Sequence, residues 1–135
     1  MDQYEIMRDI LLSTKIIASV GLSSNTEKVS YAVGLYLQGQ GYHVIPVNPT
    51  ADEIFGEKSY PDLESIPEKV DVVQVFRRSE DVPPIVESAI KIGAKVVWMQ
   101  EGIVNEDAAR MAREAGLQVV MDTCMRATHQ FLIRK

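Results

Sequence analysis

The sequence repeats one kind of unit: a short apolar run, a polar turn, a helical pattern and a glycine, followed by the next apolar run. The runs are mostly β-branched, which is typical of strands buried on both faces. Strands that alternate with helices indicate a parallel sheet with right-handed crossovers. The predicted fold class is therefore α/β: a doubly wound, mostly parallel five-stranded sheet with helices on both faces, which is a Rossmann-like arrangement. The predicted strands are Ile16–Val20, Tyr42–Val47, Asp71–Phe76, Ala94–Met99 and Leu117–Met121.

Apolar residues at helical spacing predict the helices. A helix over Asp2–Leu12 should pack on the domain, which assigns residues 1–14 to an N-terminal helix. Further helices are expected over Glu27–Gln40, over Val82–Ile92, between Asn105 and Gly116, and in the tail Asp122–Lys135. In the helix over Glu27–Gln40, one face carries Val29, Val33, Tyr36 and Leu37, and Gly39 and Gly41 supply the left-handed stop. The connection Asp52–Pro67 is expected to be irregular, with one helical turn near Leu63–Ile66.

Length and composition favour one globular domain over residues 1–135, because 46% of the residues are hydrophobic. The net charge of -5 argues against general nucleic-acid binding, which needs a basic face. Cys124 is the only cysteine, so a reducing compartment fits. No apolar run approaches the roughly 20 residues of a membrane-spanning helix, and the acidic N-terminus is unlike a signal peptide. We therefore expect a cytoplasmic protein that binds neither nucleic acid nor membranes.

The turns at the carboxyl ends of the predicted strands are where a ligand would bind in this fold. In the first turn, Gly21 allows a sharp bend, and Ser23, Ser24, Asn25 and Thr26 offer N–H groups and side-chain donors before a helix. Such a junction suits a phosphate, through both donor geometry and the helix dipole. The competing interpretation is an ordinary helix cap, and the turn alone favours neither.

The first two turns argue against a dinucleotide. Ser23 and Thr26 stand where a G-x-G-x-x-G fingerprint has its second and third glycines. The second strand ends in Val47, Asn48 and Pro49, without the acidic residue that would hold the ribose of NAD.

The third turn carries Phe76, Arg77 and Arg78, which suit a flat ring and a phosphate. The alternative is a solvated arginine pair that faces Glu80 and Asp81. The fourth turn follows Trp98 and contains Gln100, Glu101, Gly102 and Ile103, which could form a slot for a long, thin, partly polar chain.

The fifth turn holds Cys124, with His129 beyond it. A spacing of five residues does not place the two side chains on one helical face, so a catalytic pair is poorly supported. One cysteine and two distant histidines, His43 and His129, also give little support to a metal site. We assign no catalytic residue and no metal ligand.

Taken in order, these segments resemble the small CoA-binding proteins, which are similar to the N-terminal CoA-binding domain of the succinyl-CoA synthetase alpha subunit. The resemblance runs from Ile16 to about Leu132. It is carried by Val20–Ser23 with Lys28 and Ser30, by Gly41–Pro49, Val75–Arg77, Gly93–Gln100 and Glu114–Leu117, and by Cys124–Met125.

The resemblance implies a role for each matching position. Ser23, Ser24, Asn25, Thr26 and Lys28 would hold the pyrophosphate of coenzyme A, next to Gly21. Val47, Asn48, Pro49, Phe76 and Arg77 would surround the adenosine and its 3′-phosphate, and Gln100, Glu101 and Gly102 would follow the pantetheine arm. The chain departs from the family after the Asn-Pro corner, where Thr50 and Ala51 replace a lysine. That departure removes one expected phosphate contact.

The sequence therefore predicts a module that binds coenzyme A or an acyl-CoA. The synthetase needs a further domain with a phosphorylated histidine and a partner subunit, neither of which this sequence contains, so a binding module is favoured over an enzyme. Two alternatives stay open: an NAD(P)-dependent oxidoreductase, and a nucleotide-binding regulatory subunit that acts with a partner chain. A homodimer is possible, and Cys124 could form a mixed disulfide with the CoA thiol.

Overall fold

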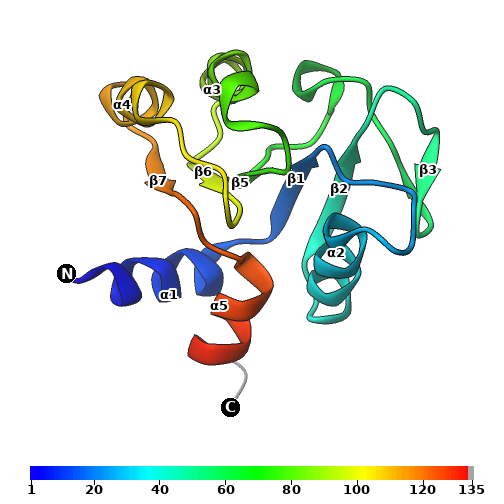
Figure 1. Ribbon diagram of the computed structural model, residues 1–135, viewed down its shortest axis with the longest axis horizontal. Coiled ribbons are helices and arrows are strands. Elements are labelled where there is room, and N and C mark those ends of the chain that lie inside the picture. Colours follow the sequence, from blue (N-terminus) through cyan, green and yellow to red (C-terminus); the bar gives the residue numbers. More distant parts are fainter. Residues whose placement is uncertain (134–135) are drawn as a thin grey trace.

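The computed structural model describes residues 1–133 (Figure 1). Within these residues, five parallel strands form one sheet in the order β2-β1-β5-β6-β7. They are β1 (Ile16–Val20), β2 (His43–Val47), β5 (Val72–Val75), β6 (Val96–Met99) and β7 (Gln118–Val120). The strand order reverses between β1 and β5, which makes their carboxyl ends the switch point of a doubly wound sheet. The predicted α/β fold class is confirmed.

Helices cover both faces of the sheet (Figure 1). Helices α3 (Val82–Lys91) and α4 (Glu106–Glu114) lie on one face, and α1 (Gln3–Ser13), α2 (Val29–Gly39) and α5 (Met125–Leu132) lie on the other. Side chains alternate along each strand, so Ala18 packs toward α3 and α4 while Ile17 packs toward the opposite helices. Both residues are fully buried, as expected for a sheet between two helical layers.

Local sequence signals account for several helix ends. The Asn105 carboxamide accepts a hydrogen bond from the Ala108 N–H at 2.9 Å, which confirms the predicted cap of α4. Asp2 caps α1 in the same way through the Glu5 N–H, also at 2.9 Å. Gly41 has a φ of 99° after α2, which confirms its left-handed conformation. Gly39 was expected to share this role, but it is the last residue of the helix.

Helix α2 begins at Val29, two residues later than predicted. The side-chain oxygen of Asn25 accepts a hydrogen bond from the Glu27 N–H at 2.9 Å, and the backbone carbonyl of Asn25 accepts one from the Lys28 N–H at 3.0 Å. These bonds hold a turn that competes with the helix. Val29 was also expected on the buried face, but 70% of it is exposed because it begins the helix at the surface.

The connection predicted to be irregular contains a short antiparallel hairpin, β3 (Glu53–Ile54) and β4 (Glu57–Lys58). Its turn places Phe55 at φ 37° and Gly56 at φ 82°. Two positive φ angles are typical of a type I′ turn, but phenylalanine is a rare first residue there, so this hairpin could not be predicted from its turn residues. A 3₁₀ turn over Leu63–Ser65 confirms the predicted helical turn, and a second one spans Ser79–Asp81.

Asp71 joins the entry of β1 to the amino end of β5. Its carboxylate accepts the backbone N–H groups of Lys15 and Ile16, each at 3.0 Å, and lies 3.7 Å from the Lys95 ammonium. Burial raises the pKa of Asp71, but these hydrogen bonds and the nearby positive charge outweigh it and hold the pKa below its usual value.

Tyr42 ties α1 to the rest of the fold. Its hydroxyl donates a hydrogen bond to the Leu11 carbonyl at 2.6 Å. Burial, together with the nearby Tyr36, raises the pKa of Tyr42 above its usual value.

The predicted C-terminal helix is present as α5, and the last two residues of that prediction, 134–135, lie outside the described residues. None of the helices within residues 1–133 has the length and apolar character needed to cross a membrane.

Candidate nucleotide-binding cleft

The switch point brings the first and third turns into direct contact. Gly21 has a φ of 90°, and a Cβ there would collide with the Phe76 carbonyl oxygen and lie 3.2 Å from the Arg77 Nε. Only glycine fits this approach without strain. The close contact sets Arg77 directly over the turn that follows β1.

A cleft of about 520 Å³ opens at this contact. It contains five of the residues predicted for the site: Gly21, Ser23, Lys28, Phe76 and Arg77. Lys28, Arg77 and Arg78 all line it, so cationic residues from the first and third turns share the cleft. Helix α2 begins at the same place and leaves the N–H groups of its first turn without partners inside the helix. Cations beside a helix N-terminus suit an anionic group such as a phosphate.

The two arginines of the third turn have different surroundings. Arg78 lies 3.3 Å from Asp81 and 3.7 Å from Glu80, as the solvated-pair interpretation expected. Arg77 forms no ion pair with any acidic residue of the described chain. Of the two arginines, the one that lies over Gly21 is therefore the one without an ion pair to an acidic residue of the described chain.

The rest of the first turn is an ordered loop. The Ser23 N–H donates to the Ser30 Oγ at 3.0 Å, and the Asn25 N–H donates to the Ser23 Oγ at 3.0 Å. Ser24, Asn25 and Thr26 are exposed and do not line the cleft. Ser30, which also lines the cleft, was quoted for the resemblance but not predicted as a site residue. Its position just after a hydroxyl-rich turn was the available signal.

A second cavity, of about 230 Å³, lies on the α3 side of the sheet and shares Arg77 with the cleft. Val47 and Pro49 line it, as the prediction for an adenosine site requires, together with Pro84 and Ile85 of α3. Asn48 is not among its lining residues. The Asn48 amide donates to the Leu22 carbonyl at 3.0 Å, and its Oδ1 accepts the Thr50 N–H at 2.9 Å. Asn48 therefore fastens the second turn to the first.

The residues after β6 also divide into two groups. Gln100 is buried, and its Oε1 accepts the Met125 N–H at 3.0 Å and a bond from the Gln74 amide at 3.3 Å. Glu101 is exposed and lines a third cavity, and the Gly102 N–H donates to the Asp122 carboxylate at 2.6 Å. Gln100 therefore connects β5 to α5.

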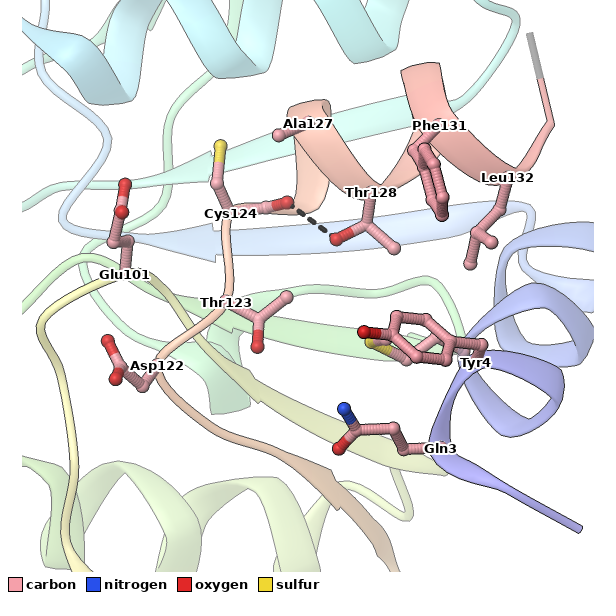
Figure 2. Close-up of a pocket in the computed structure, with 11 residues that line it drawn as sticks. Gln3, Tyr4, Glu101, Asp122, Thr123, Cys124, Ala127, Thr128, Phe131 and Leu132 are labelled. Atoms are coloured by element: carbon pink, nitrogen blue, oxygen red, sulfur yellow. Dashed lines mark hydrogen bonds between the residues drawn. The ribbon is translucent and has the colours of Figure 1, made fainter. Parts of the chain in front are cut away.

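The third cavity, of about 360 Å³, lies between α1, α5 and the turns after β6 and β7 (Figure 2). Glu101 and Cys124 both line it, which brings the fourth and fifth turns together.

His129 is buried on α5 and its Nδ1 lies 2.9 Å from the Tyr36 hydroxyl of α2. Within the part of the chain that the structure describes, no cluster of His, Cys, Asp and Glu side chains could hold a metal ion.

Comparison with known proteins decides the family. Residues 15–130 match the family described as the CoA binding domain. The chain belongs to this CoA-binding family. A protein of Bacillus subtilis (strain 168) named "uncharacterized protein YneT" is 43% identical over 123 residues, which cover 91% of each chain. The structure of a hypothetical protein from Pyrococcus horikoshii OT3 superposes with a TM-score of 0.95 at 42% identity, over 98% of this chain and 93% of that one.

A third relative is the ADP-forming acetate–CoA ligase of Methanocaldococcus jannaschii. It is 32% identical over 81 residues, which cover 60% of this chain. The matched region is only 12% of that ligase, so the chain corresponds to a small part of it. The predicted resemblance to CoA-binding domains of the succinyl-CoA synthetase type is confirmed.

Proposed function

We propose that the protein binds coenzyme A or an acyl-CoA at the carboxyl ends of its strands, as a single CoA-binding domain without catalytic activity of its own. The observation that carries this proposal is the cleft at the switch point, which Lys28 and Arg77 line beside Gly21 at the start of α2. Two cations and free helical N–H groups match a pyrophosphate. Membership of the CoA-binding family supports the same ligand.

The three cavities suggest how the ligand would lie. The pyrophosphate would occupy the cleft near Ser23 and Lys28, and the adenosine with its 3′-phosphate would lie between Val47, Pro49 and Arg77. The pantetheine arm would pass Glu101 and Gly102 toward Cys124. Asn48 and Gln100 would act as positioning residues, because their side chains hold the turns together.

Thermal unfolding with and without CoA tests the proposal. At a ligand concentration a hundredfold above the Kd, the expected stabilisation is about 2.7 kcal/mol. The unfolding entropy of a 135-residue chain converts this to a Tm increase of roughly 9 °C. NAD and ATP at equal concentration are the competitors. An unchanged Tm at millimolar CoA, or a larger shift with NAD, would overturn the proposal and favour the oxidoreductase alternative.

Two arginine variants test where the phosphate of CoA binds. Arg77→Ala should weaken CoA binding by roughly tenfold or more, because a charge-assisted hydrogen bond contributes about 1.5–3 kcal/mol. The matched control is Arg110→Ala, on the exposed face of α4, where Arg110 pairs with Asp107 at 2.6 Å. Equal affinity losses in the two variants would contradict the placement of the phosphate.

A second candidate function is a nucleotide-binding regulatory subunit that acts with a partner chain. One observation favours it: the chain spans only 12% of the ligase that it resembles. Purification from a native extract, followed by mass spectrometry of stoichiometric companions, separates this candidate from an isolated binding protein. Homodimer formation and a cytoplasmic location also stay predictions, and light scattering on the purified protein tests the first.

A further inference from the structure

The cavity between α1 and α5 has two chemically different ends. Figure 2 shows the carboxylates of Glu101 and Asp122 at one end, near Cys124, and the rings of Tyr4 and Phe131 at the other. Leu132 also lies at that end, and Met7 is a further apolar residue of the lining. Its volume of about 360 Å³ lies at the small end of the roughly 300–1,000 Å³ range of ligand pockets. The cavity is therefore large enough for a short chain.

The donors between the two ends are already engaged. The Thr123 hydroxyl donates to the Met121 carbonyl at 2.8 Å, and the Thr128 hydroxyl donates to the Cys124 carbonyl at 2.8 Å. None of the described residues that line this cavity is a lysine, arginine or histidine. The side-chain donors that remain at the apolar end, the Gln3 amide and the Tyr4 hydroxyl, are neutral. An anionic group inside would find no cation among these lining residues.

We propose that this cavity receives the acyl group of an acyl-CoA and selects a short uncharged chain over one that ends in a carboxylate. The inference rests on the proposed CoA site, since Glu101 would meet the pantetheine arm and Cys124 marks the expected position of the sulfur. An acyl chain on that sulfur would run from the end that holds Glu101 and Asp122 toward Phe131. A terminal carboxylate would share the cavity with two like charges and would find no counter-charge at the apolar end.

The experiment compares free CoA, valeryl-CoA and glutaryl-CoA by calorimetry under reducing conditions. The two acyl groups have the same chain length and differ in a terminal methyl or carboxylate group. We expect valeryl-CoA to bind several-fold more tightly than CoA, since each buried methylene contributes about fourfold in affinity. Glutaryl-CoA should bind about tenfold more weakly than valeryl-CoA. Salt at 1 M should reduce this difference in affinity, because the carboxylates of Glu101 and Asp122 are exposed and their charges are screened.

Two variants locate the selection. Asp122→Asn removes one charge and keeps an acceptor for the Gly102 N–H, and asparagine tolerates the φ of 53° at this position. Asp122→Asn should reduce the ratio of the valeryl-CoA affinity to the glutaryl-CoA affinity several-fold. The control Glu114→Gln on α4 should leave this ratio unchanged. Phe131→Ala should lower the ratio of the valeryl-CoA affinity to the affinity for free CoA. Its control is Leu12→Ala, which truncates an exposed apolar residue of α1 that does not line the cavity.

The outcomes are distinct. If CoA itself does not bind, the proposed function fails. If CoA binds but valeryl-CoA binds no better than CoA, the cavity does not receive the acyl group. If glutaryl-CoA binds as tightly as valeryl-CoA, or if Glu114→Gln changes the ratio as much as Asp122→Asn, the inferred charge selection is wrong.

Discussion

Replacing Gly21 by alanine should destabilise the protein by about 3 kcal/mol. The φ of 90° accounts for part of this cost, since a left-handed conformation costs an L-residue about 1–2 kcal/mol. The collision of the new Cβ with the Phe76 carbonyl adds overpacking, which typically costs about 1–3 kcal/mol. The colliding atom belongs to the backbone, so it can move only if the turn that carries Arg77 moves with it.

Gly41 provides a matched control for the backbone term. Its φ of 99° is close to that of Gly21, but a Cβ on Gly41 would meet no atom within 4 Å. Gly41→Ala should therefore lose only about 1–2 kcal/mol. Urea unfolding gives both values from the transition midpoints, provided that the m-value is unchanged. Both variants should remain folded, because domains are typically stable by about 5–15 kcal/mol.

CoA affinity gives an independent measurement on the same pair. Gly21→Ala should weaken CoA binding beyond its effect on stability, because it displaces Phe76 and Arg77. Gly41→Ala should bind CoA as tightly as the unchanged protein. If the two variants lose equal stability, the close approach at Gly21 makes no contribution, and the reasoning about the switch point is refuted.

Three further predictions concern other parts of the molecule. The lowered pKa of Asp71 contributes stability above its unfolded pKa of about 3.9, and that contribution is lost as the pH falls through the lower folded pKa. In Asp71→Asn, the free energy of unfolding measured with urea should therefore fall less steeply at acidic pH than in the unchanged protein. An equally steep fall in the variant would contradict this. Asn105→Ala should cost about 1 kcal/mol through the lost cap of α4, and a change within error would contradict the cap's contribution. Cys124 is partly exposed and should form a mixed disulfide with CoA under diamide, seen as an intact-mass adduct. An adduct that persists in Cys124→Ala would contradict this assignment.

The fold could be predicted because burial on both sheet faces leaves a simple pattern. Val72, Val73 and Val75 are all fully buried in β5, so the strand is mostly apolar on both faces and only Gln74 interrupts the pattern. Strand ends were less predictable. Asp71 was assigned to the strand, but it lies before β5 and its carboxylate bonds to the N–H groups of the β1 entry.

The positions of the candidate site residues followed from topology, but their orientations did not. Parallel strands end at one edge, so Gly21 and Arg77 were expected near each other, and they are in contact. Nothing in the sequence distinguishes an amide that faces a ligand from one that bonds to the protein. Gln100 and Asn48 were both expected to face the ligand, and both bond to neighbouring turns through backbone groups. Such partners are distant in sequence and leave no local pattern.

The three cavities lie on different sides of the sheet, and this arrangement limits which ligand can use all of them. One opens toward α3, and another opens between α1 and α5 on the opposite face. A ligand that reached both would have to cross the rim of the sheet, and the cleft at Gly21 offers such a crossing beside two cations. A compact mononucleotide would not need this path. A long ligand with a nucleotide at one end, a pyrophosphate next to it and a thin flexible arm would use it fully. The absence of a side chain at Gly21 would thus serve both the packing of the switch point and the passage of the ligand over it.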